Sequence, residues 1–315
     1  MLWMESITKP LVTRDQLSLI CQEHLGEGLE SARELTDGWF NAAFLLVGVG
    51  GREAVLKMAP PDSVRVMRYE QGLMNAEVSA LRLVKERTSI PVPAVIAYDT
   101  SRQLVGSDFF LTDRLPGRPL SDVRSEMGEE VQAHVDRQVG GHLRELHEVH
   151  GPRFGTFNSP DSPSWGEAFG LLMDWLRQDA ADLEVELPDG TFEAAEPHLW
   201  ALAEAETPTL VHWDLWDPNI FVLPDSGDVT GYIDFERALW GDPLIEANFR
   251  EPRAAFMEAY GSCVMDAPGS PSRRLLYTLY LDIIMVIESR FRGFTAEHET
   301  WARGLLEGAI RQCAA

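Results

Sequence analysis

Hydrophobic and polar residues alternate along the first third of the chain as they do in the short strands of a half-buried sheet. Residues 40–49 and 54–58 are two such runs, and a Gly-rich turn at 48–51 joins them, which predicts a β-hairpin. A phosphate-binding glycine loop joins a strand to a helix, so we interpret this stretch as a hairpin turn. Two further strands are predicted over residues 94–98 and 108–112.

Two helices are predicted beside these strands. Residues 11–30 contain Thr13 and Gln16, whose spacing is typical of a capping box, followed by apolar positions at helical intervals. Residues 64–87 carry a longer helical pattern, which two prolines end. The first third of the chain is therefore expected to form a small, mainly antiparallel sheet with one long helix.

The pattern becomes mostly helical after a proline-containing segment at residues 113–119. Three short apolar runs interrupt the helices between residues 209 and 235. We expect an α+β protein with an N-terminal lobe at 1–112, a hinge at 113–119 and a helical lobe at 120–315. The helices are predicted at about 125–149, 165–183, 193–206, 243–261, 270–291 and 295–313, and the strands at 209–211, 219–223 and 229–235.

Charge limits the classes of partner. The 315 residues carry a formal net charge of -23, which argues against a general nucleic-acid binder, whose footprint would be basic. Residues 161–206 hold twelve Asp or Glu and one Arg, a net charge of 1 − 12 = −11. This segment is either a solvated helical face or a wall of the active site that would attract a cationic substrate.

Three features of the sequence argue against a metal site built from cysteine or histidine and against a secreted or membrane protein. The three cysteines are far apart, which suits a reducing cytoplasm and excludes a cysteine-rich zinc site. His142 and His147 lie five apart on an amphipathic helical pattern without HExxH, so we interpret them as incidental. No signal peptide is evident, and the apolar run at 275–287 is too short to span a bilayer and contains Asp282, so we expect a buried helix and no membrane association.

The stretch at 209–242 carries the chemistry. His212 and Asp214 follow one predicted strand, Asn219 opens the next, and Asp234 ends the third. Phosphoryl transfer needs this arrangement, in which one carboxylate orients the attacking hydroxyl while an amide and a second carboxylate hold a metal on the phosphates. The alternative is an Asx-rich turn without chemistry.

The N-terminal part supplies residues that could belong to the same site as the stretch at 209–242. Lys57 stands inside an apolar strand, where lysine is unfavourable unless its charge is used, and Glu70 and Glu77 lie near the apolar face of the long helical pattern. Either glutamate could hold the Lys57 ammonium towards phosphates. Asn41 ends a short run of small and polar residues, 37–41, that is either a surface turn or a place where backbone approaches a phosphate.

Together these motifs resemble the aminoglycoside phosphotransferase family, which includes choline-type and fructosamine-type small-molecule kinases on a protein-kinase-like fold. The resemblance rests on Val-His-Trp-Asp-Leu-Trp-Asp-Pro-Asn-Ile and Tyr-Ile-Asp-Phe-Glu, with Ala-Val-Leu-Lys and Phe-Phe-Leu-Thr-Asp-Arg-Leu-Pro-Gly-Arg-Pro-Leu upstream. It implies ATP and Mg²⁺ as cofactors. The resemblance also implies that Asp214 orients or deprotonates the acceptor hydroxyl, that His212 braces the loop, and that Asn219 and Asp234 bind Mg²⁺. In the N-terminal part it implies that Lys57 contacts the α- and β-phosphates and that Glu77 (or else Glu70) pairs with Lys57. The backbone around Asp113 and Leu115 would bind adenine.

Some positions depart from the family. Trp213 stands where these kinases usually carry Gly, and Glu236 stands where many carry a second Asp; Glu236 either assists the metal or faces solvent. A protein-kinase Gly-rich loop and an Ala-Pro-Glu segment are absent from the sequence, which argues against a protein substrate. We expect a cytoplasmic monomer or homodimer that phosphorylates a small, cationic molecule such as an aminoglycoside-type antibiotic, which would confer antibiotic resistance, or an amino sugar. The alternatives are a choline- or fructosamine-type metabolite kinase and a nucleotide-binding pseudokinase.

Overall fold

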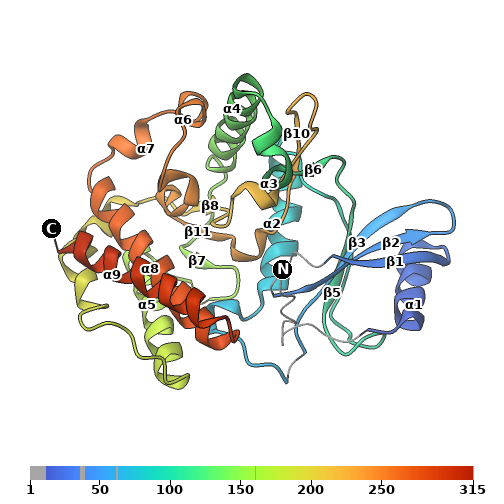
Figure 1. Ribbon diagram of the computed structural model, residues 1–315, viewed down its shortest axis with the longest axis horizontal. Helices are drawn as coiled ribbons and strands as arrows, with labels where there is room; N and C mark the ends of the chain where they lie inside the picture. Colours follow the sequence, from blue (N-terminus) through green and yellow to red (C-terminus); the bar gives the residue numbers. More distant parts are fainter. Residues whose placement is uncertain (1–11, 36–39, 62, 160, 315) are drawn as a thin grey trace.

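The computed structural model describes residues 12–35, 40–61, 63–159 and 161–314. A twisted antiparallel sheet stands at one side of the molecule and a larger, mostly helical part at the other, with one long helix between them (Figure 1).

The N-terminal sheet has five strands in the order β1-β2-β3-β5-β4. The predicted hairpin and the two further strands are confirmed. β1 was not predicted because its sequence, LESAREL, is polar and lacks an apolar face; it is an edge strand paired only with β2 in the described sheet. The bounds are Leu29–Leu35 for β1, Ala42–Gly48 for β2, Glu53–Met58 for β3, Val95–Asp99 for β4 and Phe109–Asp113 for β5.

Helix α1, Arg14–Leu25, covers one face of this sheet. Its capping box is confirmed: the Gln16 amide donates to Thr13 Oγ1 at 3.2 Å and the Thr13 amide donates to Gln16 Oε1 at 2.9 Å. The helix ends five residues before the predicted limit, since Gly26 adopts φ +77°, a left-handed conformation that ends helices.

Helix α2, Leu73–Arg87, is shorter than the predicted 64–87. Gly72 at φ +75° precedes it, and the residues before that form a 3₁₀ turn, Arg68–Glu70, so Glu70 does not belong to the helix. The buried face of α2 packs into the large core of the helical part, whereas α1 and the opposite face of the sheet form a separate, smaller cluster. Helix α2 thus stands between the sheet and the helical part (Figure 1).

The helical part contains most of the predicted helices. Residues 193–206 instead form a 3₁₀ helix, Glu193–Glu204, with Pro197 inside it. Residues 243–253 form two 3₁₀ turns before the short helix α6, because Pro252 interrupts the helical hydrogen bonds. The helices are α3 Leu120–Val123, α4 Glu129–Leu146, α5 Trp165–Asp182, α6 Ala254–Tyr260, α7 Cys263–Asp266, α8 Ser270–Phe291 and α9 Ala296–Cys313.

Two three-stranded sheets, ordered β7-β11-β8 and β10-β9-β6, hold the predicted chemical stretch. The strand predicted at 229–235 ends at Tyr232, because Asp234 adopts φ +69° and leaves the sheet. Asn219 lies in a 3₁₀ turn before its predicted strand. The bounds are β6 Arg118–Pro119, β7 Gly155–Thr156, β8 Thr209–Val211, β9 Ile220–Val222, β10 Val229–Tyr232 and β11 Leu239–Gly241.

The expected buried helix at 275–287 is confirmed as the middle of α8. Within the described ranges, no helix is long and apolar enough to cross a membrane. The division into lobes at residues 113–119 stays a prediction.

Candidate active site

The loop between β8 and β9 carries His212, Asp214 and Asn219. Its backbone is held from below by Glu246, whose fully buried carboxylate accepts hydrogen bonds from the amides of His212 at 2.6 Å and Trp213 at 2.9 Å. Sequence reasoning missed Glu246, because it lies more than thirty residues away in a segment without a recognised motif.

Both ring nitrogens of His212 contact main-chain groups. The Asp214 amide donates to Nδ1 at 3.2 Å, and Nε2 lies 3.0 Å from the Ile233 carbonyl, so Nδ1 accepts and Nε2 carries the proton. The ring also packs on Phe235 with centroids 4.2 Å apart. His212 therefore joins the Asp214 loop to the Asp234 loop, and neither nitrogen is free to move a proton.

Asp214 and Asn219 are connected directly. The Asn219 side-chain amide donates from Nδ2 to the Asp214 carbonyl at 2.9 Å and to its carboxylate Oδ2 at 3.3 Å. The Ile233 amide donates to the Asn219 carbonyl at 3.1 Å, which brings the residue before Asp234 next to Asn219. Burial raises the pKa of Asp214, and the positive charge of Arg237 opposes this effect. The three polar residues of the predicted motif thus converge in one place.

Lys57 completes the group from β3. Its Nζ lies 2.8 and 2.9 Å from the two carboxylate oxygens of Glu77 on α2 and 2.6 Å from Oδ1 of Asp234. Burial opposes the charged ammonium, but the carboxylates of Asp234 and Glu77 outweigh it and raise the Lys57 pKa. Although burial works against ionisation of Asp234 too, the ammonium lowers its pKa. Glu77, and not Glu70, is therefore the partner of Lys57.

Glu236 is a third carboxylate in this group. It is buried, contrary to the solvent-facing alternative, and burial together with the charge of Asp234 raises its pKa well above the usual value. Burial also raises the pKa of Glu77 to about 7, although the Lys57 ammonium opposes this rise. One oxygen from each of Glu77, Asp234 and Glu236 lies within 4.8 Å of the others. A cation is the natural occupant of such a cluster.

Asn41 reaches this cluster from the sheet. Its Nδ2 donates to Glu236 Oε2 at 2.8 Å, and its Oδ1 is buried without a hydrogen-bond partner. The rest of the predicted phosphate-approaching run, residues 37–39, lies outside the described residues. Asn41 thus ties the start of β2 to the segment that follows Asp234.

The predicted adenine hinge runs along the edge of the β10-β9-β6 sheet. The Asp113 amide already donates to the Ala94 carbonyl at 3.0 Å, so this N–H is not free for a base. The side chain of Leu115 lies against Gly231, where an added Cβ would be 2.5 Å from Leu115 Cδ1. Thr230 Oγ1 donates to the Pro116 carbonyl at 2.6 Å and fixes the segment to the helical part. Recognition of a base by the backbone around Leu115 stays a prediction.

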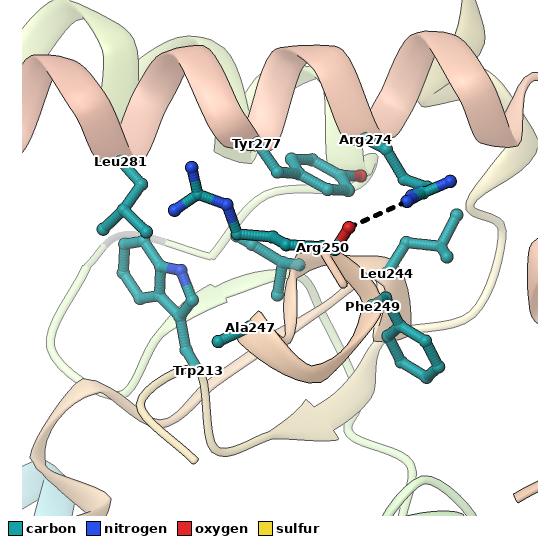
Figure 2. Close-up of a pocket in the computed structure, with 9 residues that line it drawn as sticks. Trp213, Leu244, Ala247, Phe249, Arg250, Arg274, Tyr277 and Leu281 are labelled. Atoms are coloured by element: carbon teal, nitrogen blue, oxygen red, sulfur yellow. Dashed lines mark hydrogen bonds between the residues drawn. The ribbon is translucent and has the colours of Figure 1, made fainter. Parts of the chain in front are cut away.

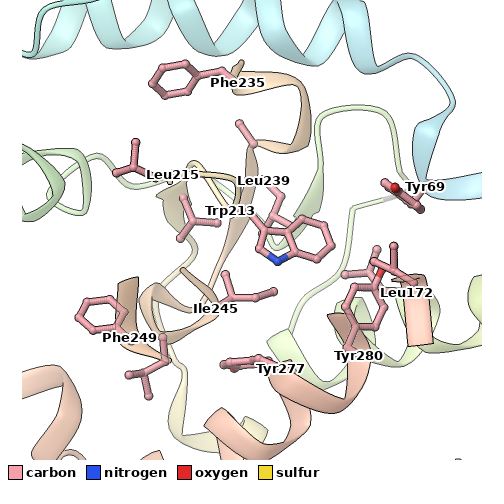
Figure 3. Packing of buried hydrophobic residues seen from close by; sticks show 14 of the residues in the cluster. Tyr69, Leu172, Trp213, Leu215, Phe235, Leu239, Ile245, Phe249, Tyr277 and Tyr280 are labelled. Carbon is pink, nitrogen blue, oxygen red and sulfur yellow. The ribbon is translucent and has the colours of Figure 1, made fainter. Parts of the chain in front are cut away.

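Trp213 has a left-handed backbone, the conformation that favours glycine. Its φ of +64° is strained for a bulky side chain. The indole stacks on Tyr280 of α8 with centroids 5.4 Å apart and meets Tyr69 edge-on at 6.5 Å (Figure 3). On another side it lines a small pocket with Ile245, Tyr277 and Leu281, into which Arg250 reaches (Figure 2). The aromatic packing stabilises a backbone that glycine would adopt without strain.

A buried ionic network lies next to the site. Glu70 accepts from Arg292, which directly follows α8. Glu288, one turn earlier, accepts from Arg292 at 3.2 Å, from Arg237 at 3.2 Å and from the Tyr69 hydroxyl. Arg237 and Glu288 both influence the pKa of Asp214, so the network is close enough for its charges to act on that carboxylate. These pairs could not be predicted from the sequence, because the partners are as much as 222 residues apart.

Two aspartates of the acidic segment and the histidines His142 and His147 have ordinary partners. Asp179 and Asp182 at the end of α5 bind Arg68, and Asp182 also binds Arg65 at 3.0 Å. His142 Nδ1 lies 2.8 Å from the Tyr232 hydroxyl and His147 Nδ1 lies 2.8 Å from the Tyr260 hydroxyl. In the described parts of the chain, neither histidine belongs to a group that could hold a metal.

Comparison with known proteins adds the family context. The sequence model of a family described as "Phosphotransferase enzyme family" matches residues 31–249, more than two thirds of the 315 residues. This range includes all the residues predicted for the site.

Two curated relatives differ in how much of them the chain covers. An Aspergillus fumigatus (strain Af293) protein named "Subtelomeric hrmA-associated cluster protein" is 23% identical over 144 residues, 45% of this chain, and the chain spans only 28% of that protein's length. An Escherichia coli (strain K12) protein named "Probable ketoamine kinase YniA" is 26% identical over 241 residues, which cover 72% of this chain and 74% of that protein.

Solved structures share the fold across nearly the whole chain. A putative fructosamine-3-kinase from Thermobifida fusca YX-ER1 has a TM-score of 0.68 at 21% identity, covering 95% of this chain and 100% of that chain. A thermostable mutant of aminoglycoside phosphotransferase APH(4)-Ia, in a ternary complex with AMP-PNP and hygromycin B, has a TM-score of 0.66 at 18% identity, covering 94% and 98%. These likenesses confirm the predicted two-lobed, kinase-like α+β fold.

Proposed function

The chain belongs to the phosphotransferase enzyme family, and on this premise we propose that it is a small-molecule kinase, which transfers the γ-phosphate of ATP to a hydroxyl group of its acceptor. The observation that carries the proposal is the convergence of Lys57, Glu77 and Asp234 on one side and of Asp214 and Asn219 on the other. Such a transfer needs an ammonium group that binds the phosphates and a carboxylate that orients the acceptor hydroxyl.

The residues present also fit Mg²⁺. Carboxylate oxygens of Asp234 and Glu236 lie close together, and the hydrogen bonds of the Asn219 side chain use only Nδ2, which leaves its Oδ1 as a ligand. Asp234 and Asn219 would hold the ion, with Glu236 beside them. When bound, Mg²⁺ neutralises charge on the transferring phosphates.

The chain's own residues then divide the work. Lys57, held by Glu77, binds the phosphates, and Leu115 reads the base through its backbone. Asp214 orients the acceptor hydroxyl and receives its proton, while Asn219 fixes the Asp214 carboxylate. His212 holds the Asp214 backbone and takes no part in proton transfer.

For the acceptor we propose a small polar molecule that carries an amine as well as the hydroxyl. The net charge of -23 favours an acceptor with a cationic group. Two similar proteins support two versions of this class: one structure holds hygromycin B, and one relative is named a ketoamine kinase. An aminoglycoside and an amino sugar or ketoamine are therefore the first acceptors to test.

The test is a coupled ADP-release screen against aminoglycosides, ketoamines, other amino sugars and choline. With an acceptor found, Asp214→Asn should lower kcat by about 10³-fold or more and leave ATP affinity nearly unchanged, because the hydroxyl loses its base and the phosphates keep Lys57. Asp225→Asn, in the exposed turn after β9, is the matched control and should match wild type. Wild-type turnover by Asp214→Asn would refute the assignment of the base, and ATP binding without transfer to any acceptor would indicate a pseudokinase.

A further inference from the structure

His147 is a buried histidine that the proposed function does not use. It directly follows helix α4, which packs against α6 (Figure 1). Its Nδ1 lies 2.8 Å from the hydroxyl of Tyr260 at the end of α6, and its Nε2 is buried without a hydrogen-bond partner among the described residues. The same Nε2 lies 3.6 Å from Oε1 of Glu246. The unused nitrogen of His147 is therefore next to the carboxylate that holds the catalytic loop.

Glu246 needs a partner of this kind. It is fully buried, and a carboxylate removed from water is unfavourable unless hydrogen-bond donors or an opposite charge compensate for the lost water. Each of its oxygens accepts one backbone amide, Oε1 from His212 and Oε2 from Trp213. Within the described ranges, His147 is the only residue that forms an ion pair with it. His147 is thus the one side chain available to stabilise this buried charge.

The position of the proton on His147 follows from its two neighbours. Burial raises the pKa of Tyr260, so its hydroxyl stays protonated and can donate to Nδ1. Nε2 then carries the proton of the ring. The opposite tautomer would place the lone pair of Nε2 next to the Glu246 carboxylate, which is repulsive. The N–H of His147 is therefore on the side of Glu246.

A second histidine of α4 provides a comparison within the molecule. His142 Nδ1 lies 2.8 Å from the Tyr232 hydroxyl, and the two rings meet edge-on with centroids 5.5 Å apart. His147 and Tyr260 have the same arrangement, at 2.8 and 5.6 Å. His142 forms no ion pair with a carboxylate in the described part of the chain, whereas His147 adds Glu246. The contact with the catalytic loop is what distinguishes His147.

We propose that His147 is a positioning residue for the phosphoryl transfer. Its Nε2–H stabilises the carboxylate of Glu246, which holds the amides of His212 and Trp213, the two residues before Asp214. The ends of α4 and α6 are thereby connected to the loop that carries the base. This inference rests on the proposed function, because it concerns how the same site is held in place.

The test compares His147→Gln with His147→Asn by coupled ADP release with the best acceptor. The glutamine amide nitrogen takes about the position of Nε2, and the asparagine amide nitrogen that of Nδ1, so only glutamine keeps a donor for Glu246. We expect kcat within about threefold of wild type for His147→Gln and about tenfold lower for His147→Asn, as for the loss of one hydrogen bond to a charged group. KM for ATP should change by less than about twofold in both, because Lys57 lies on another element.

The matched controls are His142→Gln and His142→Asn, which make the same changes at a tyrosine contact on the same helix and should both keep the kcat of wild type. Urea unfolding is measured for all four variants. A merely structural role for His147 predicts lower stability in both of its variants and no difference in kcat between them, and that result overturns the inference.

A spectroscopic measurement tests the proton assignment without turnover. Long-range ¹⁵N–¹H spectra of the full chain with labelled histidine show which ring nitrogen is protonated, and the His147 signals are those missing from His147→Gln. A proton on Nε2 is expected; an unprotonated Nε2 overturns the inference and leaves the kinase assignment standing. ATP binding without transfer to any acceptor in the screen overturns the kinase assignment, whereas the spectrum of His147 does not depend on it.

Discussion

Glu246 offers the most direct test of how the catalytic loop is held. Its carboxylate accepts the amides of His212 and Trp213 at 2.6 and 2.9 Å. A hydrogen bond to a charged group contributes about 1.5–3 kcal/mol. The left-handed backbone of Trp213 costs about 1–3 kcal/mol. The two bonds together exceed this strain, whereas one bond alone is only comparable with it.

Replacing Glu246 by Ala removes both acceptors. We expect the backbone at Trp213 to leave the left-handed region and to displace Asp214, so that kcat falls by about 100-fold, the usual effect of a 1 Å displacement of a catalytic group. KM for ATP should change by less than about threefold, because Lys57 lies on a different element. Two buried amides without acceptors should lower the free energy of unfolding by about 3–5 kcal/mol.

The assay is coupled ADP release with the best acceptor, together with equilibrium unfolding in urea. Glu251→Ala removes an exposed carboxylate five residues further on and should match wild type in both. A Glu246→Ala protein that is folded and retains the kcat of wild type would refute the reasoning, because the strained loop would then hold its geometry without these bonds.

Three further outcomes follow from the site. Lys57→Met should lower kcat/KM for ATP by about 100-fold or more, because the phosphates lose their ammonium, whereas the exposed Lys85→Met should match wild type by ADP release. Burial raises the pKa of Glu77 to about 7 from 4.5; the folded state then holds more protons than the unfolded state between these values, so without metal the free energy of unfolding should fall by about 3 kcal/mol as pH rises from about 5 to 7.5. Urea titrations at several pH values measure this decrease in the free energy of unfolding, and Glu77→Gln should remove it. A free energy of unfolding that rises between pH 5 and 7.5 would contradict the prediction. Asn41→Ala should raise KM for ATP roughly fivefold, measured by ADP release, because Glu236 loses its donor; an unchanged KM would count against a role for Asn41.

The part of the site that could be predicted consists mainly of residues that are close together in the sequence. Asp214 and Asn219 are five residues apart in a tight loop, so their contact needs little beyond the turn itself. Lys57 could be predicted because a charge is unfavourable in an apolar strand unless it is used, and the family resemblance implies Glu77 as its partner. The pattern at 64–87 predicted a helix that is too long. The spacing of apolar residues does not reveal that Gly72 adopts a left-handed conformation, after which the helix begins.

What the sequence could not provide is pairing across long separations. Glu70 lies beside an apolar helical face in the sequence, yet it binds Arg292 at the other end of the chain. Glu246 belongs to no motif, and its role depends on two backbone amides, which any residue type would offer. The acidic segment left a solvated face and a cation-attracting wall as alternatives, and it could not show that Asp179 and Asp182 bind arginines from the segment before α2.

The position of α2 has a consequence for movement. The buried residues of α2 belong to the large core of the helical part. The buried residues of the sheet are divided between that core and the smaller cluster next to α1. The ion pair between Lys57 and Glu77 therefore joins a strand of the sheet to a helix anchored elsewhere. Any shift of β3 relative to α2 would therefore change the distance between the Lys57 ammonium and the Glu77 carboxylate. That distance is a direct measure of how the sheet and α2 are placed relative to each other.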